Sequence, residues 1–322
     1  MTRRTGAMLS IAPMMGYTDR AGRYFLRRLT KHARLYTEML TAQAILHGDR
    51  QRLLAFGACE QPLTLQIGGS DPDELAAAAK IGATFGYNGI NLNLGCPSSR
   101  VGEGGFGACL MGRPERAARC VRAMAEAVDI PVSVKCRIGI DEQDPEREFV
   151  PFIERLADAG CEEFIVHARK AWLNGLSPKE NRTLPPLQYD VVYRLKETHP
   201  HLRIHLNGGI ETLEQAQSVL GGLDGVMIGR AAFANPWMLS QVDRLWFQKD
   251  RAPSGRGEVL EEMLAHAFAR AQAGEMPRAS LRHCMTLYRG IKGGKAFRRK
   301  LNDIMQAPLA ENQLAQIAQL SP

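Results

Sequence analysis

The residues of this 322-residue chain that could carry out chemistry recur at one kind of place, directly at or after the end of a short apolar run. Singly, each has a structural explanation: a lone histidine at a strand end is usually structural, and a lysine there can extend from the rim of a fold. Together they predict one polar site within an apolar fold. They are Gln66, Asn93, Cys96, Lys135, His167, Asn207 and Arg230.

Cys96 lies between Gly95 and Pro97, which predicts a turn rather than a core position. An ordinary cysteine thiol, with a pKa of about 8.5, is mostly protonated at neutral pH and can act as a general acid. No histidine adjoins it in sequence, so a Cys–His nucleophile has no support. The glycine-rich segment 101–109 that follows is expected to be a mobile lid that carries the cysteine.

Two glycine-containing turns follow later apolar runs. They are Asn207-Gly208-Gly209 and Ile228-Gly229-Arg230. Glycines let backbone N–H groups approach a phosphate closely, although a tight turn alone also explains each of them. The adjacent pair, with Arg230 beside it, indicates a phosphorylated cofactor or substrate.

The elements that must position these residues are eight short apolar runs separated by helical stretches. This pattern is typical of a parallel sheet covered on both faces. A doubly wound sheet has fewer strands, and its nucleotide-binding form has a glycine-rich turn after the first, which Ala12–Gly16 lacks. We therefore expect a (β/α)8 TIM barrel, whose active site lies at the C-terminal ends of its strands. The expected strands are 9–14, 34–39, 63–67, 89–94, 132–137, 163–167, 203–206 and 225–228, and the clearest helices are 75–84, 115–127 and 213–220.

Strand signals stop at about Pro253, and helical stretches over 258–273, 278–289 and 297–305 follow. We expect a catalytic barrel over 1–250 and a small all-helical domain over 251–322. Between Arg278 and Lys300 there are eight Lys or Arg residues and no Asp or Glu, which favours contact with an RNA phosphate backbone. The spacing of Phe297, Leu301 and Ile304 predicts that they face the helical core and leave Arg298, Arg299 and Lys300 outside.

Composition sets the remaining limits. The net charge of +7 and pI near 9.1 agree with a polyanionic partner. Seven cysteines without a CxxC pair predict neither a disulfide framework nor a zinc site. The apolar stretch near the N-terminus is broken by Pro13 and Asp19, so we expect no signal peptide and no membrane span. These features predict a cytoplasmic protein without a metal, and a monomer.

The ordered motifs resemble those of the tRNA-dihydrouridine synthases over essentially the whole chain. Asn-x-Gly-Cys-Pro-Ser is the specific element, whereas the glycine turns and the Ala-Pro-Met start recur in other flavin barrels. The tail resembles the branch that acts on positions 20 and 20a of the tRNA D-loop. The motifs are Ile11–Met15, Gln66–Gly69, Asn93–Ser98, Val134–Gly139, Val166–Arg169, Asn207–Ile210, Ile228–Arg230 and Tyr288–Arg299.

The resemblance implies tightly bound FMN at the barrel mouth, reduced by NADPH. Reduced FMN would give hydride to C6 of a tRNA uridine, and Cys96 would give a proton to C5. Lys135 would hold the anionic side of the flavin ring. The other implied cofactor contacts are Pro13, Met14, Met15 and Gln66 at the ring, and His167, Asn207, Gly208, Gly209, Gly229 and Arg230 at the phosphate end.

The implied RNA contacts begin with Asn93 near the target uridine. Lys179 and Arg182 match positions where the family touches tRNA, and Arg298 and Arg299 belong to the basic tail. Each of these surface charges could equally be an ordinary solvated group.

Three other functions compete. A flavin barrel that reduces a free pyrimidine would share the cofactor groups and a loop cysteine but would not need the basic tail. An RNA-binding protein on an inactive barrel would not need Cys96, Lys135 and His167 together. An aldolase could use Lys135 as a Schiff base, although the flavin-type elements around it argue against this.

Overall fold

The computed structural model describes residues 6–249, 253 and 255–306. Its sheet is parallel, in the order β1-β9-β8-β7-β6-β5-β4-β2, with β3 paired to β4. Hydrogen bonds from Arg34 N to Leu9 O (3.0 Å) and from Ile11 N to Arg34 O (2.9 Å) join β1 to the chain entering β2 and close the barrel. The strands are β1 (Met8–Ile11), β2 (Leu35–Tyr36), β3 (Leu40–Thr41), β4 (Leu63–Gly68), β5 (Gly89–Leu94), β6 (Val132–Arg137), β7 (Glu163–His167), β8 (Arg203–Asn207) and β9 (Gly225–Ile228).

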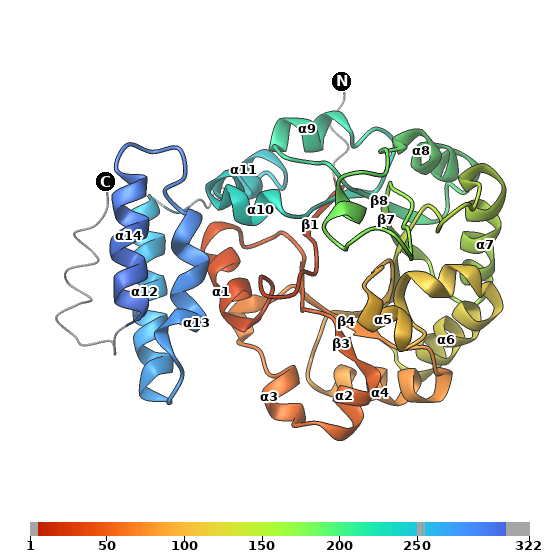
Figure 1. Cartoon of the computed structure of the whole chain (residues 1–322), viewed down its shortest axis with the longest axis horizontal. Coiled ribbons are helices and arrows are strands. Elements are labelled where there is room, and N and C mark those ends of the chain that lie inside the picture. The colour runs from red at the N-terminus through yellow and green to blue at the C-terminus, as the bar shows by residue number, and fades with distance from the viewer. Residues whose placement is uncertain (1–5, 250–252, 254, 307–322) are drawn as a thin grey trace. The chain divides into compact units, whose positions relative to one another are not determined.

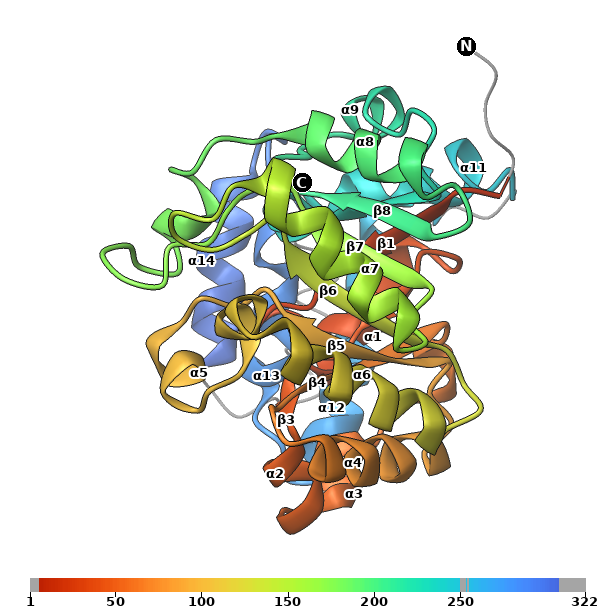
Figure 2. The same cartoon turned by 90° about the vertical axis from the view of Figure 1, so that its right-hand side faces the viewer.

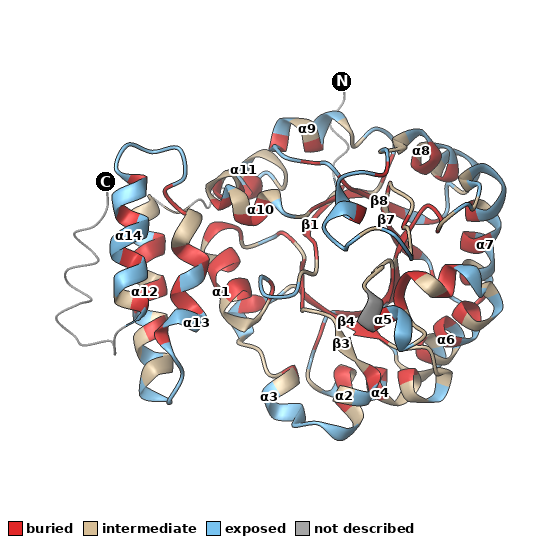
Figure 3. Cartoon of the chain, viewed as in Figure 1, coloured by how far each residue is buried: buried red, intermediate tan, exposed pale blue. Residues whose placement is uncertain are grey.

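Helices surround the strands on the outside of the barrel (Figure 1). Every residue of β4 and β5 is buried, because one side of each strand faces the barrel interior and the other faces the helices. The strands are the most continuously buried elements, while the helices expose their outer faces (Figure 3). The barrel helices are α2 (Ala42–His47), α3 (Arg50–Leu54), α4 (Pro72–Thr84), α5 (Ser99–Glu103), α6 (Pro114–Ala127), α7 (Val150–Asp158), α8 (Tyr189–Thr198) and α9 (Leu213–Ser218).

Local sequence accounts for the starts of α4 and α6. The Asp71 side chain accepts hydrogen bonds from the N–H groups of Asp73 and Glu74, and Pro72 occupies the first turn of α4. Pro114 likewise occupies the first turn of α6, which has no side-chain cap, and Ala117, Val121 and Met124 form its buried stripe at three- and four-residue spacing. Proline in the first turn thus marks where both helices begin.

A second compact unit contains the remaining helices. It comprises Met15–Ala33, Gly57–Glu60 and the residues from Arg230 onward, whereas the barrel unit comprises the residues up to Met14, Arg34–Phe56 and Gln61–Gly229. The expected boundary between 250 and 251 falls outside the described residues. The helices of the second unit are α1 (Arg20–Leu29), α10 (Ala231–Ala234), α11 (Val242–Leu245), α12 (Arg256–Gln272), α13 (Pro277–Leu281) and α14 (Gly294–Met305).

The expected TIM barrel followed by C-terminal helices is confirmed. The ranges expected for β5, β6, β7 and β9 agree with the structure. Strand β1 ends at Ile11 rather than at 14, since Pro13 has no N–H to continue the ladder. Strand β3 was missed because two residues carry no alternating pattern. The helix expected over 278–289 is divided into α13 and a 3-10 turn, Arg282–Thr286.

Candidate active site

The turn that carries Cys96 follows β5 and is fixed by Asn93. The Asn93 Oδ1 atom accepts hydrogen bonds from Gly95 N (3.1 Å) and from Cys96 N (3.0 Å). Ala108 N donates to Cys96 O at 3.0 Å from the following segment. The Cys96 thiol is half-buried, and its Sγ lies 3.5 Å from the Ser98 hydroxyl. The buried Asn93 side chain therefore holds the main chain at Cys96, whose thiol is partly accessible.

The segment after this turn, expected as a mobile lid, contains α5 and a 3-10 helix, Gly107–Gly112. Gly107 has φ +73°, and a Cβ there would lie 2.7 Å from the Cys96 carbonyl oxygen. Only glycine fits this approach without strain. Gly107 thus serves a close packing of the segment against the Cys96 turn.

A chain of amides crosses the barrel interior beside that turn. Asn93 Nδ2 donates to Gln66 Oε1 (2.9 Å), and Gln66 Nε2 donates to Asn91 Oδ1 (2.8 Å). Gln66 and Asn91 are both almost fully buried. Because each amide is paired, the orientation of Asn93 is fixed from β4 as well as from its own strand.

Lys135 and Asn207 form the next polar pair. Asn93 and Lys135 are register partners in β5 and β6. Lys135 Nζ donates to Asn207 Oδ1 (3.1 Å), and Asn207 Nδ2 donates to Met227 O (2.8 Å). Lys135 is half-buried by surface area, and burial lowers its pKa to about 8, with the Arg137 charge acting in the same direction. The site therefore holds an ammonium group that is readily deprotonated.

His167 and the turn after β8 lie beside this pair. His167 and Asn207 are register partners at the ends of β7 and β8. Gly208 has φ +117°, and a Cβ on it would lie 2.7 Å from His167 Cδ2. The Tyr189 hydroxyl donates to Gly208 O. A glycine is required here because the backbone passes directly over the imidazole ring.

The residues expected at a flavin ring are divided between the two units. Pro13 and Met14 belong to the barrel unit and are half-buried, and Met14 packs against Ala12, Tyr36, Ile165 and Met227. Met15 belongs to the second unit, with 66% of its surface exposed.

The glycine turn after β9 ends at the same boundary. Gly229 ends the barrel unit. A Cβ added to it would have only Ala12 Cβ nearby, at 4.0 Å. Arg230 opens the second unit as the exposed N-cap of α10.

The loop after β7 carries Lys179 and Arg182, both of which are exposed. It is folded around Asn181, a fully buried residue whose side chain accepts from Trp172 N (2.8 Å) and donates to Trp172 O (2.8 Å) and Leu176 O (3.2 Å). The loops that follow β5 and β7 emerge at the same end of the barrel (Figure 2). The loop thus presents its two exposed cations from a fixed support.

Two residues of this region were missed by the sequence analysis. Arg137, at the end of β6, is buried and donates to the carbonyls of Gly95, Lys170 and Asn181. Asn181 organises the loop as described above. Main-chain carbonyls are present at every residue, so the partners of Arg137 leave no pattern in the sequence. The nearest signal is the Lys-Cys-Arg stretch that contains Arg137.

The basic helix α14 belongs to the second unit. Phe297 and Leu301 are buried, whereas Arg298, Arg299 and Lys300 are exposed, as the spacing predicted. Ile304 is half-buried, and Met305 completes the buried stripe.

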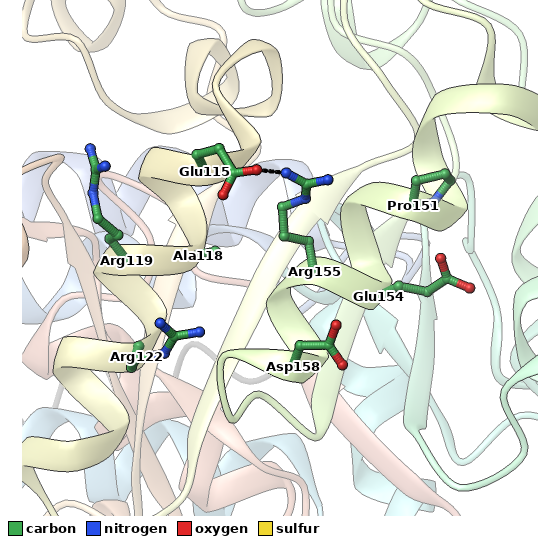
Figure 4. A pocket seen from close by; sticks show the side chains of 8 residues that line it. All are labelled: Glu115, Ala118, Arg119, Arg122, Pro151, Glu154, Arg155 and Asp158. Atoms are coloured by element: carbon green, nitrogen blue, oxygen red, sulfur yellow. Dashed lines mark ion pairs between the residues drawn. The ribbon is translucent and has the colours of Figure 1, made fainter.

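A charged groove on the outside of the barrel contains none of the expected site residues. It lies between α6 and α7 (Figure 4) and includes an ion pair between Arg155 and Glu115. Its other charged side chains are Arg119, Arg122, Glu154 and Asp158.

The described residues contain neither a metal cluster nor a membrane span. No group of three or more His, Cys, Asp or Glu side chains among them could hold a metal ion. No helix in the described part of the chain is long and apolar enough to cross a membrane. All seven cysteines are free, and Cys120, Cys136, Cys161 and Cys284 are buried.

Comparison with known proteins identifies the family. The family model described as dihydrouridine synthase matches residues 10–321. The chain belongs to the dihydrouridine synthase family. A tRNA-dihydrouridine(20/20a) synthase of Synechocystis sp. is 53% identical over 310 residues, which cover 96% of this chain and 93% of that protein. The protein of the same name in Shewanella oneidensis is 54% identical over 294 residues, with 91% and 88% covered.

A solved structure agrees on the fold. The complex of 2-naphthoyl-CoA reductase with 2-naphthoyl-CoA aligns with a TM-score of 0.56 and 13% identity, over 73% of this chain and 49% of that one. As a dihydrouridine synthase, the chain is an oxidoreductase, since dihydrouridine differs from uridine by the addition of two hydrogens to the base.

Proposed function

We propose that the chain reduces uridine to 5,6-dihydrouridine in the D-loop of tRNA, at positions 20 and 20a, with FMN as cofactor and NADPH as reductant. The relatives named for that reaction, at 53% and 54% identity, support the substrate. The residue assignment depends on a single observation, the turn that carries Cys96. Asn93 on β5 holds the main chain of this turn, and its register partner on β6 is Lys135.

The residues of the barrel mouth fit FMN. Lys135 would offer a half-buried cation to the flavin ring, and buried Gln66, which accepts from Asn93 Nδ2, would hydrogen-bond the ring edge. At the phosphate end we assign His167, Asn207, Gly208 and Gly209, because a turn of two positive-φ glycines lets main-chain N–H groups come close to a phosphate. Pro13, Met14, Met15, Gly229 and Arg230 complete the assignment.

When bound and reduced, FMN supplies the hydride for C6 of the uracil. The protein's own part is the second hydrogen, because the Cys96 thiol gives its proton to C5 and is left as a thiolate. Asn93 fixes the main chain of Cys96, so the thiol does not drift from the base. Lys135 contributes positive charge on the adjacent strand while it remains protonated. Solvent returns the proton to Cys96.

We assign tRNA contact to Asn93, Lys179 and Arg182 on the barrel and to Arg298 and Arg299 on α14. The four basic side chains are exposed, so their charges can reach a phosphate backbone. The residues from 251 onward would form the tRNA-binding domain. We propose that the enzyme acts as a monomer in the cytoplasm.

Cys96→Ala tests the assignment most directly. The variant is expected to retain FMN and to oxidise NADPH, yet to lose dihydrouridine formation, because only the proton donor is missing. Cys109→Ala is the matched control: Cys109 is also half-buried and lies in the segment after the turn, where its thiol donates to Phe106 O. Normal product from Cys96→Ala would remove Cys96 from its role.

The cofactor is tested separately by colour and mass. The purified protein is expected to be yellow, and heat is expected to release FMN that mass spectrometry identifies. A colourless protein that takes up no flavin would overturn the proposed reaction.

A further inference from the structure

Arg137 is a buried cation that donates its hydrogen bonds to main-chain carbonyls. It is the last residue of β6, and only 2% of its surface is exposed. Its Nε donates to Gly95 O at 3.1 Å, and its Nη1 donates to Lys170 O at 3.0 Å and to Asn181 O at 2.8 Å. Among the described residues no carboxylate forms an ion pair with it.

This arrangement is costly for a residue without a specific task. A buried charge loses its hydration, and a guanidinium that faces carbonyl dipoles instead of a carboxylate recovers only part of it. Burial accordingly lowers the pKa of Arg137 to about 10, with the nearby Arg182 and Arg169 charges adding to the effect. The group still remains charged at neutral pH, so it acts as a permanent donor of several hydrogen bonds.

The three carbonyls belong to two separate segments that each carry an assigned function. Gly95 immediately precedes Cys96, and its own N–H is held by Asn93. Lys170 and Asn181 begin and close the loop that carries Lys179 and precedes Arg182. A planar guanidinium has a fixed geometry, so the position of one segment limits the position of the other.

The loop is itself stiff enough to transmit that constraint. The Asn181 amide is bonded to Trp172 and Leu176 within the loop. Asp141, from the segment after β6, accepts from Leu173 N at 2.8 Å, and Lys170 Nζ donates to Asp141 O at 2.7 Å. The loop is therefore braced at both ends and from a neighbouring segment.

We propose that Arg137 is a positioning residue that couples the loop of residues 170–182 to the Cys96 turn. RNA held by Lys179 and Arg182 thereby fixes the place of the proton donor. This inference rests on the proposed function, because it takes Cys96 as the donor and the loop as an RNA contact. Arg137 acts through main-chain carbonyls, and we assign it no contact with the base or the cofactor.

The test compares Arg137→Lys with Arg27→Lys. Arg27 is a matched control in the second unit: it is 1% exposed, donates to Glu60 O (3.2 Å) and Thr30 O (3.1 Å), and has its pKa lowered to about 10. Both variants keep the charge and lose the planar geometry. For each we would measure tRNA Kd, kcat at saturating tRNA, FMN content, and amide hydrogen exchange of peptides over 93–98 and 170–182.

Arg137→Lys is expected to lower kcat at least tenfold while it changes tRNA Kd less than threefold and leaves FMN content unchanged. Amide exchange is expected to rise in both peptides together. Arg27→Lys should change neither kcat nor exchange in those peptides. Should Arg137→Lys not fold, Asn181→Asp tests the same link from the loop, because it removes two donors and leaves Arg137 in place.

Three results would overturn the inference. A weaker tRNA Kd with unchanged kcat would make Arg137 an RNA-binding residue only. An equal loss of kcat in Arg27→Lys would show that the loss in Arg137→Lys comes from lower protein stability. Unchanged amide exchange in the 93–98 peptide would show that Arg137 does not couple the loop to the Cys96 turn. Failure of the proposed function is distinguishable, since full product from Cys96→Ala would discard the proton donor while the exchange result still reports on the coupling.

Discussion

At the scale of single residues, the site is built from buried polar groups that satisfy one another. Asn93 donates to Gln66 and accepts from the Cys96 main chain, so one amide links the barrel interior to the reacting turn. Lys135 and Asn207 form a second such pair. Buried polar groups of this kind are expensive unless paired, and full pairing gives them fixed orientations. The Cys96 main chain and the Lys135 ammonium, which carry the proposed chemistry, are thereby held by the protein itself.

The role proposed for Lys135 predicts that cofactor binding depends on pH. Its pKa is lowered from 10.5 to about 8 because burial disfavours the charged form. In the free protein the ammonium is present below pH 8 and lost above it, so FMN should bind more weakly as pH rises through 8, because its ring loses a charged hydrogen-bond donor. We expect FMN Kd, measured by fluorescence titration, to rise by up to about tenfold per pH unit above that point.

Lys135→Met provides the comparison. It should bind FMN more weakly at pH 7, and its Kd should not follow the same rise between pH 8 and 9.5. The sign for folding is opposite: between pH 8 and 10.5 the unfolded lysine is charged and the buried one is not, so stability of the free protein rises with pH across that window. An identical pH profile in both proteins would exclude Lys135 from flavin binding.

At the scale of elements, the turn after β8 shows how backbone conformation shapes the proposed cofactor end of the site. Gly208→Ala should destabilise the protein by about 1–3 kcal/mol, because φ +117° strains any side chain and the new Cβ would lie 2.7 Å from His167 Cδ2. FMN affinity should fall as well if His167 is displaced. Thermal denaturation and FMN titration measure the two effects.

Gly229→Ala is the matched control on the neighbouring strand. Its φ is not positive, and its Cβ would meet only Ala12 Cβ at 4.0 Å, so the loss of stability should stay below about 0.5 kcal/mol. An equal loss of stability in the two variants would show that the close approach of Gly208 to His167 does not affect stability.

The same scale explains what the sequence could predict. Strands such as β5 and β6 are short runs in which aliphatic residues alternate with polar ones, so their bounds and the polar residues near their ends followed from the sequence. The loop after β7 did not, because Asn181 and Arg137 act on main-chain carbonyls 5 to 44 residues away. The lid expected from glycine count contains short helices, since Gly107 serves close packing.

At the scale of the whole molecule, charge is concentrated where RNA contact is proposed. Arg298 and Arg299 are exposed on α14 while Phe297 and Leu301 form its buried face, so their side chains can change without loss of core. Replacing both arginines with glutamate should raise tRNA Kd at least tenfold. It should also make the plot of log binding constant against log salt concentration less steep. The slope should fall by about 0.7–0.9 for each phosphate that is no longer neutralised. FMN content should stay unchanged.

A double change of Arg119 and Arg122 to glutamate controls for net charge. These arginines line the groove between α6 and α7 (Figure 4), where no RNA contact is assigned. The control alters the molecular charge by the same amount, so it should weaken binding only slightly. If both double variants bind tRNA alike, the tail contributes through general attraction and makes no direct contact.

The most direct test of the account is mass-spectrometric mapping of dihydrouridine in tRNA from a strain that lacks this gene. We expect dihydrouridine to be lost at positions 20 and 20a of the D-loop and to remain at other positions. Wild-type protein should restore it, and Cys96→Ala protein should not. Unchanged dihydrouridine at positions 20 and 20a in the deletion strain would contradict the account.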